Sequence, residues 1–222
     1  MTLRHSFHNV RVPKALLIDL DGTLIDSEPW YKKTEVATLN QFGVPMDLDD
    51  MEEFTGLTLP SWMRLINTRY EKEISTEAFL ESYRPSMVSH VQSDVEMFPD
   101  AVRFLERFAG TPAVLVTSSM KWYVDEVLSK FSQIADAIVG VVCEADVKIG
   151  KPDPEPYKLA SELLKLLPSE AWVVEDAPNG VKSGQAAGCK VIGIDRPGRG
   201  SIDFADLVVS SLDDVHDAQL NA

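Results

Sequence analysis

The stretch ALLIDLDGT, residues 15–23, joins four apolar residues to two acids and a glycine. A short apolar run that ends in this way is typical of a buried strand that leads into a polar loop. Open α/β sheets bind their ligands at the carboxyl ends of the strands, so Asp19 and Asp21 lie where chemistry can be carried out. The two acids could also flank an ordinary turn before Gly22, and their meaning therefore depends on the other segments.

Five further apolar runs have the character of strands, the last more weakly than the rest: residues 113–116, 137–142, 171–174, 190–194 and 207–209. Between these runs, apolar residues recur at the spacing of amphipathic helices. The helical patterns comprise Ala101, Phe104, Leu105 and Phe108; Val124, Val127, Leu128 and Phe131; and Ala160, Leu163, Leu164 and Leu167. The alternation predicts an α/β fold, a Rossmann-like doubly wound and mostly parallel sheet with helices on both faces.

Residues 29–94 break this alternation. Residues 30–42 and 76–91 have the composition of helices, and we expect Pro85 to interrupt the second. Turn residues at 43–45 and 54–56 separate them, with no apolar run that predicts a buried strand. We therefore expect a small helical domain inserted after the first strand. The predicted boundaries are a flexible arm at 1–13, a core at 14–28 and 95–222, and the helical insertion at 29–94.

The composition narrows the classes of partner. The 222 residues contain 21 Lys and Arg against 35 Asp and Glu, a formal net charge of −14. Such a surface repels nucleic acid and anionic membranes, but a metal ion and a lysine can still attract a small phosphorylated metabolite. Cys143 and Cys189 follow apolar or small residues and are expected to be buried free thiols. Residues 1–13 lack the apolar segment of a signal peptide, their His5 and His8 are expected to be solvated, and we expect a cytoplasmic monomer.

Three of the predicted strands end in polar side chains of different kinds. Asp19 and Asp21 follow the first strand, Thr117, Ser118 and Ser119 follow residues 113–116, and Glu175 and Asp176 follow residues 171–174. In a parallel sheet these ends share one edge, so four carboxylates and several hydroxyls converge. The carboxylates would repel one another unless a cation lies among them, and a site of hard oxygen ligands suits Mg²⁺.

The same residues suggest a reaction on phosphorus. Thr117 and the backbone N–H groups that follow it are placed to hold phosphate oxygens at the start of a helix. Asp19 would be the nucleophile, and Asp21 would transfer protons. Some of these residues could instead have a purely structural role. Thr117 or Ser119 could cap the helix that follows them, and Asp176 could cap the helix that follows it.

Lys151 supplies a cation in the segment KIGKPDP, residues 148–154. A single lysine before proline is usually a solvated loop residue. Here two prolines stiffen the backbone around it, which suits a lysine that must reach a fixed point. A cation at this place would offset the repulsion among the carboxylates and hold phosphate.

Four segments together resemble the motifs of the haloacid dehalogenase-like hydrolase superfamily, in the order found there: DLDGTL at 19–24, VTS at 116–118, GKP at 150–152 and VEDAPNG at 174–180. Residues 147–157 and 175–178 are also similar to the β-phosphoglucomutase-like group, and there to glycerol-phosphate and deoxyglucose-phosphate phosphatases. The resemblance extends from residue 14 to about residue 209, and the helical insertion corresponds to the cap of these enzymes.

The resemblance implies a role for each residue of the motifs. Asp19 would form an aspartyl-phosphate, while Asp21 would protonate the leaving oxygen, then activate water, and add its backbone carbonyl to the metal shell. Phosphate binding would fall to Thr117, the Ser118 N–H and Lys151, and Mg²⁺ would be held by Asp176, with Glu175 acting directly or through water.

The expected function is therefore Mg²⁺-dependent hydrolysis of small phosphorylated sugars or polyols. A phosphomutase shares all four motifs, but such enzymes typically carry a hinge histidine and a cap arginine where this chain has Tyr31 and Leu59. The acid at Asp21 argues against a dehalogenase, and the length and helical insertion argue against a non-catalytic, receiver-like phospho-acceptor module. Candidates for substrate contacts in the insertion are Glu28, Trp30, Leu57, Arg64 and Arg84.

Overall fold

The computed structural model describes residues 13–51, 59–197 and 200–216 of the chain. These residues form two compact units, one from the described residues up to 26 and from 97 onward, and the other from the described residues between 27 and 96. We call them the α/β unit and the helical unit and describe each by itself. The predicted arm at residues 1–13, with His5 and His8, lies outside the described residues except for Pro13.

The α/β unit is built on a six-stranded sheet in which every pair of neighbours is parallel. The first strand lies inside the sheet, the second and third strands follow on one side of it, and the fourth to sixth strands follow on the other side. The order reverses at the first strand, which makes its carboxyl end the expected ligand-binding point. From edge to edge the strands are β3 (Gly140–Val142), β2 (Ala113–Val116), β1 (Ala15–Ile18), β4 (Ala171–Glu175), β5 (Lys190–Ile194) and β6 (Leu207–Val209).

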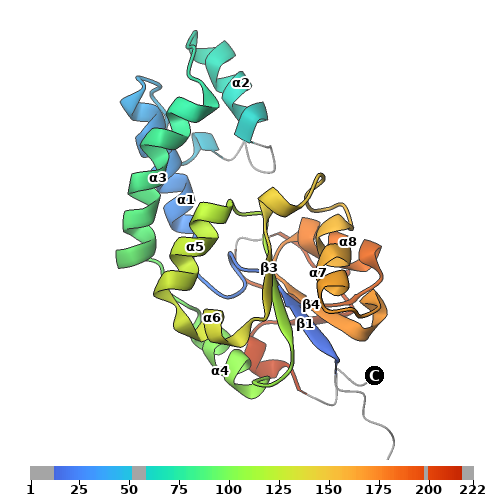
Figure 1. Ribbon diagram of the computed structural model, residues 1–222. Helices are drawn as coiled ribbons and strands as arrows, with labels where there is room; N and C mark the ends of the chain where they lie inside the picture. Colours follow the sequence, from blue (N-terminus) through green and yellow to red (C-terminus); the bar gives the residue numbers. More distant parts are fainter. Residues whose placement is uncertain (1–12, 52–58, 198–199, 217–222) are drawn as a thin grey trace, which may run out of the picture. The chain divides into compact units, whose positions relative to one another are not determined.

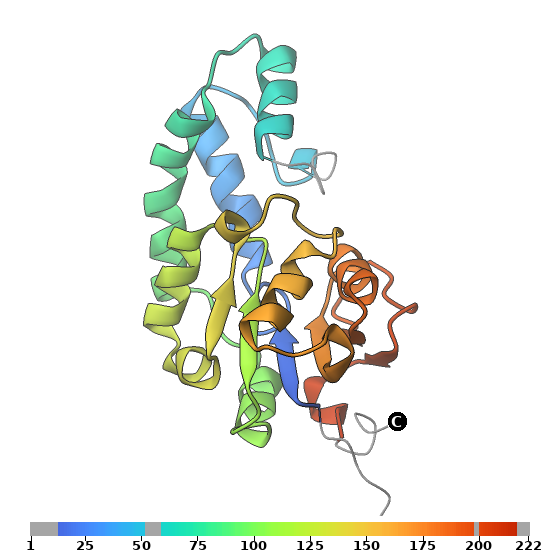
Figure 2. The same ribbon diagram turned by 45° about the vertical axis from the view of Figure 1, so that its right-hand side comes forward.

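Helices cover both faces of this sheet, as Figures 1 and 2 show. Successive side chains of β1 point to opposite faces. Leu17 packs in the core beneath α7 (Glu155–Leu163) and α8 (Pro178–Ala187), whereas Leu16 and Ile18 lie beneath α4 (Pro99–Arg107) and α6 (Ser132–Ala137). Because both faces are covered, β1 is apolar and buried at every position. The predicted α/β fold is confirmed.

Two predicted elements of the α/β unit have different boundaries. The predicted strand 137–142 begins only at Gly140, because α6 occupies the chain up to Ala137. The apolar face predicted around Leu163 and Leu167 is wrong, since these side chains are 55% and 66% exposed. The helix α7 ends at Leu163 and buries residues nearer its start instead: Pro156, Tyr157, Ala160 and Ser161.

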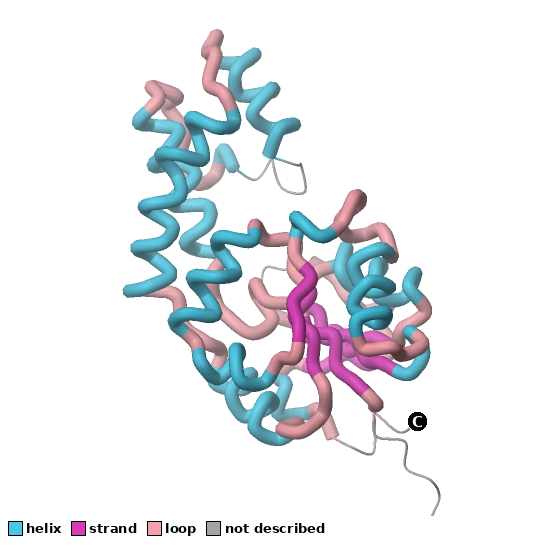
Figure 3. Tube along the Cα trace, viewed as in Figure 1, coloured by secondary structure: helices cyan, strands magenta, loops and turns pink. Residues whose placement is uncertain are grey.

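The helical unit contains α1 (Glu28–Gln41), α2 (Leu59–Tyr70) and α3 (Thr76–Ser93), and Figure 3 shows a short loop between α2 and α3. The predicted interruption of α3 is wrong, because the helix continues through Pro85. Pro85 is exposed, so water can satisfy the carbonyl group that the proline leaves without a backbone donor. The sequence did not predict α2, and the turn predicted at 54–56 lies outside the described residues.

The expectation for the two cysteines is confirmed. Cys143 and Cys189 are buried and free, as expected. Among the described residues, no helix is both long and apolar enough to span a membrane.

Arg196, just after β5, connects the loop that follows β1 to the start of α4. Its Nε and Nη2 atoms donate to the carbonyl oxygens of Gly22 and Thr23 at 3.2 and 3.3 Å. Nη2 also donates to Asp100 Oδ1 at 3.0 Å, and the guanidinium group lies 3.7 Å from the centre of the Phe98 ring. The loop that carries Asp21 is therefore tied to α4 by one guanidinium group, which is 12% exposed.

Asp100 is the anionic partner in this network and also accepts hydrogen bonds from Ser211 Oγ at 3.1 Å and the Leu212 N–H at 2.9 Å. Burial by itself raises the pKa of Asp100, but the bonds from Arg196, Leu212 and Ser211 outweigh burial and hold this pKa below its usual value. A carboxyl group of this kind stabilises the fold above its unfolded-state pKa of about 4, and the contribution is lost as the pH falls through the lower folded pKa.

We therefore expect Asp100→Asn to lower the free energy of unfolding at pH 7 by about 1.5–3 kcal/mol. The deficit should shrink below about pH 4, where the wild-type carboxyl also becomes protonated. Urea unfolding at several pH values measures both effects. Asp213→Asn is a suitable control, because the Asp213 pair with Arg103 is exposed and screened by solvent and should contribute much less than the buried Asp100 network. A deficit that is the same at pH 3 and pH 7 would contradict the ionic role of Asp100.

Candidate active site

Three buried carboxylates meet at the carboxyl ends of β1 and β4. Asp19 follows β1, Glu175 ends β4, and Asp176 comes next. The two strands are hydrogen-bonded neighbours, and the Asp19 N–H donates to the Val174 carbonyl at 3.0 Å. One oxygen of each carboxylate lies within 4.8 Å of the others. The parallel sheet thus brings together residues from two distant motifs.

Lys151 enters this cluster from the loop before α7. Its Nζ atom donates to Asp19 Oδ1 and to Glu175 Oε1, both at 2.6 Å, and to the Val116 carbonyl at 2.9 Å. The side chain is only 8% exposed. Burial alone would lower the pKa of Lys151, but Asp19 and Glu175 outweigh it and raise this pKa above its usual value. Lys151 is therefore an ammonium group and not the solvated loop residue of the structural alternative.

The charges of the cluster do not balance. Three buried carboxylates face one ammonium group, which leaves two negative charges in excess. Burial and repulsion from Glu175 raise the pKa of Asp19 well above its usual value, although Lys151 acts in the opposite direction. A divalent cation with oxygen ligands would supply the missing charge, and the residues present fit such an ion.

Tyr157 and Gly180 determine where the Glu175 carboxylate lies. The Tyr157 hydroxyl donates to Glu175 Oε1 at 2.6 Å, and the Ala177 N–H donates to Oε2 at 3.3 Å. A Cβ atom at Gly180 would lie 1.8 Å from Oε1, so only glycine leaves room for the carboxylate there. Neither residue has a role predicted from the sequence, although Tyr157 closes the segment 147–157 that resembles the phosphatases named above.

Asp21 lies outside the cluster of three carboxylates that could hold a metal ion. The chain turns sharply after it, because Gly22 adopts a φ of 83° and donates its N–H to the Ile25 carbonyl at 2.8 Å. The Asp21 side chain accepts hydrogen bonds from Ser119 Oγ at 2.6 Å and from the Tyr123 hydroxyl at 2.9 Å. The two acids of the first motif thus have different environments, and the sequence did not single out Tyr123.

Thr117 is buried at the end of β2, and Ser118 beside it is exposed. Thr117 Oγ1 accepts the Ser119 N–H at 3.0 Å and lies 3.5 Å from Asp21 Oδ2. The capping alternatives are wrong. The helix α5 (Lys121–Lys130) has Met120 as its N-cap, and α8 has Ala177, with no side-chain cap on either helix. A further contact, missed by the sequence analysis, joins Thr23 Oγ1 to Asp176 Oδ1 at 3.3 Å.

The substrate candidates of the insertion lie in the helical unit, apart from Leu57, which is outside the described residues. Glu28 lies 3.9 Å from Lys32, and the Trp30 ring stacks on His90 at 4.8 Å. Arg64 and Arg84 are both exposed. Nothing in these contacts assigns a ligand to any of them.

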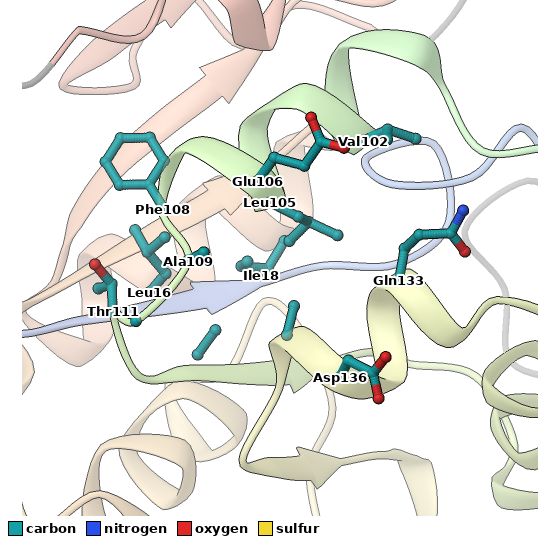
Figure 4. A pocket seen from close by; sticks show the side chains of 13 residues that line it. Leu16, Ile18, Val102, Leu105, Glu106, Phe108, Ala109, Thr111, Gln133 and Asp136 are labelled. Atoms are coloured by element: carbon teal, nitrogen blue, oxygen red, sulfur yellow. The ribbon is translucent and has the colours of Figure 1, made fainter.

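A separate hollow of about 260 Å³ lies between α4 and α6, against Leu16 and Ile18 (Figure 4). Its walls are mostly apolar, with Glu106, Gln133 and Asp136 among the polar residues. None of the clustered acids lines this hollow, so it is distinct from the site at the strand ends.

Comparison with known proteins agrees with this geometry. Residues 16–194 match the family described as haloacid dehalogenase-like hydrolase. The chain belongs to this family. It is 32% identical over 209 residues to hexitol phosphatase A of Escherichia coli (strain K12), which covers 91% of this chain and 93% of that protein. It is also 31% identical over 187 residues to the validoxylamine A 7'-phosphate phosphatase of Streptomyces hygroscopicus subsp. limoneus, which covers 82% and 85%.

A solved structure shows the same fold as this haloacid dehalogenase-like hydrolase. A variant of CbbY from Rhodobacter sphaeroides, in complex with xylulose-(1,5)bisphosphate, superposes with a TM-score of 0.82 over 94% of this chain and 99% of that one, at 20% identity. Both curated relatives are named as phosphatases, and the predicted class of enzyme, a phosphoric monoester hydrolase, is confirmed.

Gly180→Ala tests the close approach of α8 to Glu175. An alanine inside a helix is usually more stable than glycine by about 1 kcal/mol. Here we expect the reverse, a loss of about 1–3 kcal/mol, because the added methyl group must displace the carboxylate. Phosphatase activity should fall more than about tenfold, since a displaced Glu175 no longer holds Lys151. Thermal unfolding and p-nitrophenyl phosphate hydrolysis measure the two effects.

Gly184→Ala on the same helix is the matched control. Its Cβ atom would approach Val191 and Val173 side chains and not a polar group. This variant should lose stability but keep its activity at temperatures where it is folded. Full activity in Gly180→Ala would show that the position of Glu175 does not matter.

Proposed function

We propose that this protein is a Mg²⁺-dependent phosphatase that hydrolyses small phosphorylated sugars or polyols through an aspartyl-phosphate on Asp19. The observation that carries the proposal is the position of the buried Lys151 ammonium group between Asp19 and Glu175. A positive charge there opposes the effects of burial and of Glu175 on Asp19, favours its ionised form as a nucleophile, and can also donate a hydrogen bond to a phosphoryl oxygen.

The proposed reaction has two transfers of the phosphoryl group. In the first, an Asp19 carboxylate oxygen bonds to phosphorus, the bond from phosphorus to the ester oxygen breaks, and Asp21 gives its proton to the departing oxygen. In the second, Asp21 takes a proton from water, whose oxygen bonds to the same phosphorus. The bond to Asp19 then breaks, which releases inorganic phosphate and restores the carboxylate.

We assign one set of residues to the phosphoryl group and another to the metal ion. We assign the Thr117 hydroxyl, the Ser118 N–H and Lys151 to its oxygens. Glu175, Asp176, the Asp19 carboxylate and the Asp21 carbonyl oxygen would hold Mg²⁺. When bound, the metal ion would neutralise charge on the phosphoryl oxygens and on the carboxylates. The Thr23 hydroxyl would orient Asp176 through its hydrogen bond.

The substrate class rests on the names of the relatives. One relative is named as a hexitol phosphatase, one as a validoxylamine A 7'-phosphate phosphatase, and a third as a fructose-1-phosphate phosphatase. We propose the same class here, with the helical unit as the cap that selects the substrate. Tyr31 and Leu59 stand where phosphomutases of this group carry a histidine and an arginine, which favours hydrolysis over mutase activity. We further propose that the protein is a cytoplasmic monomer.

Asp19→Asn should abolish the release of phosphate from p-nitrophenyl phosphate, with a loss of about a thousandfold or more, because an amide cannot form the acyl phosphate. The fold should remain, as judged by circular dichroism and thermal unfolding. The remote Asp213→Asn variant serves as a control for activity. Magnesium-dependent turnover that survives in Asp19→Asn would refute the assignment of the nucleophile.

A substrate screen tests the metal and the substrate class together. We expect EDTA to remove the activity and added Mg²⁺ to restore it, because the acidic cluster carries an excess of negative charge. Hexitol and sugar monophosphates should be hydrolysed with higher kcat/KM than nucleotide monophosphates. An enzyme that acts on nucleotides alone would refute the substrate class, and full activity in EDTA would refute the metal requirement.

A further inference from the structure

We propose that Tyr123 and Ser119 are positioning residues that hold the Asp21 carboxyl group for proton transfer to the leaving oxygen. The proposal rests on the role of Asp21 in the proposed function and extends it to two residues outside the four motifs. Its basis is the contrast between the partners of the two acids that follow β1. Asp19 is held by an ammonium group, and Asp21 is held by hydroxyl groups.

Both oxygens of Asp21 are engaged by one short segment of the chain. Ser119 Oγ donates to Oδ2 at 2.6 Å, and the Tyr123 hydroxyl donates to Oδ1 at 2.9 Å. Ser119 lies just before α5, and Tyr123 lies in the first turn of that helix. Two contacts to two different oxygens fix both the place of the carboxyl group and the rotation of its plane.

Tyr123 is itself held rigidly. Its side chain is 1% exposed, and the neighbouring Val124 and Val127 bury the same face of α5. The Tyr123 N–H donates to the Met120 carbonyl at 3.0 Å, which anchors the start of the helix. A buried tyrosine hydroxyl needs a hydrogen-bond partner, and Asp21 provides one here. The carboxyl group of Asp21, in the loop after β1, thus gains its orientation from a helix packed in the core.

Hydroxyl partners suit a group that must exist in two protonation states. An ammonium group can only donate, so it favours the ionised carboxylate, as Lys151 does for Asp19. A hydroxyl group can donate to the carboxylate and can rotate to accept from the protonated acid. Hydroxyl partners such as Ser119 and Tyr123 can therefore stay in contact with Asp21 through both transfers of the proposed reaction.

The test compares phosphate esters that differ in how much their leaving group needs a proton. The p-nitrophenyl, phenyl and p-methylphenyl phosphates have similar size but increasingly basic leaving oxygens. We expect Tyr123→Phe to lower kcat/KM by about tenfold for the phenyl and p-methylphenyl esters but by less than about twofold for p-nitrophenyl phosphate. Ser119→Ala should act in the same direction, and it tests the proposal separately if Tyr123→Phe does not fold.

Tyr157→Phe is the matched comparison, because it removes a tyrosine hydroxyl from Glu175 and not from Asp21. It should lower kcat/KM for the three esters by similar factors. If Tyr123→Phe and Ser119→Ala also affect the three esters equally, while Asp21→Asn affects the basic leaving groups most, the positioning proposal is overturned and the proposed function stands. If Asp21→Asn itself affects the three esters equally, Asp21 is not the proton donor, and the mechanism of the proposed function fails as well.

Discussion

The buried ammonium group of Lys151 is the contact on which the site depends. It joins Asp19, Glu175 and the Val116 carbonyl, and so connects the ends of β1, β4 and β2. Without it, buried carboxylates at neighbouring strand ends would repel one another in a region of low dielectric constant. The ammonium group offsets part of this repulsion and leaves an excess of negative charge that suits a divalent cation. One side chain thus serves the fold and the chemistry together.

The two acids that follow β1 have different hydrogen-bond partners. The ammonium group next to Asp19 favours the ionised form of its carboxylate, whereas the hydroxyls of Ser119 and Tyr123 donate to Asp21. The sheet allows this difference, because β2 and β4 flank β1 on opposite sides and different residues follow each of them. The loop after β1 is further fixed by Arg196. This side chain donates to the Gly22 carbonyl in the loop and to Asp100 in the first turn of α4.

The pattern of apolar residues was sufficient to predict the architecture but not the ends of the helices. Buried strands stand out because both of their faces are apolar, and the sheet followed from them. The face of α7 was predicted wrongly, because Leu163 and Leu167 are apolar yet exposed, and Tyr157 near the start of the helix is buried instead. Pro85 was read as an interruption of α3, but an exposed position lets water satisfy the free carbonyl.

The sequence by itself determined which groups are available to the site, because acids and hydroxyls follow strands whose ends a parallel sheet must bring to one edge, and one lysine lies in a loop stiffened by prolines. Only the tertiary structure decided which group meets which. Tyr123 reaches Asp21 across 102 positions of the chain, and Lys151 reaches Asp19 across 132. No local pattern encodes such pairs, because the packing of α5 and of the loop before α7 sets the position of each donor atom.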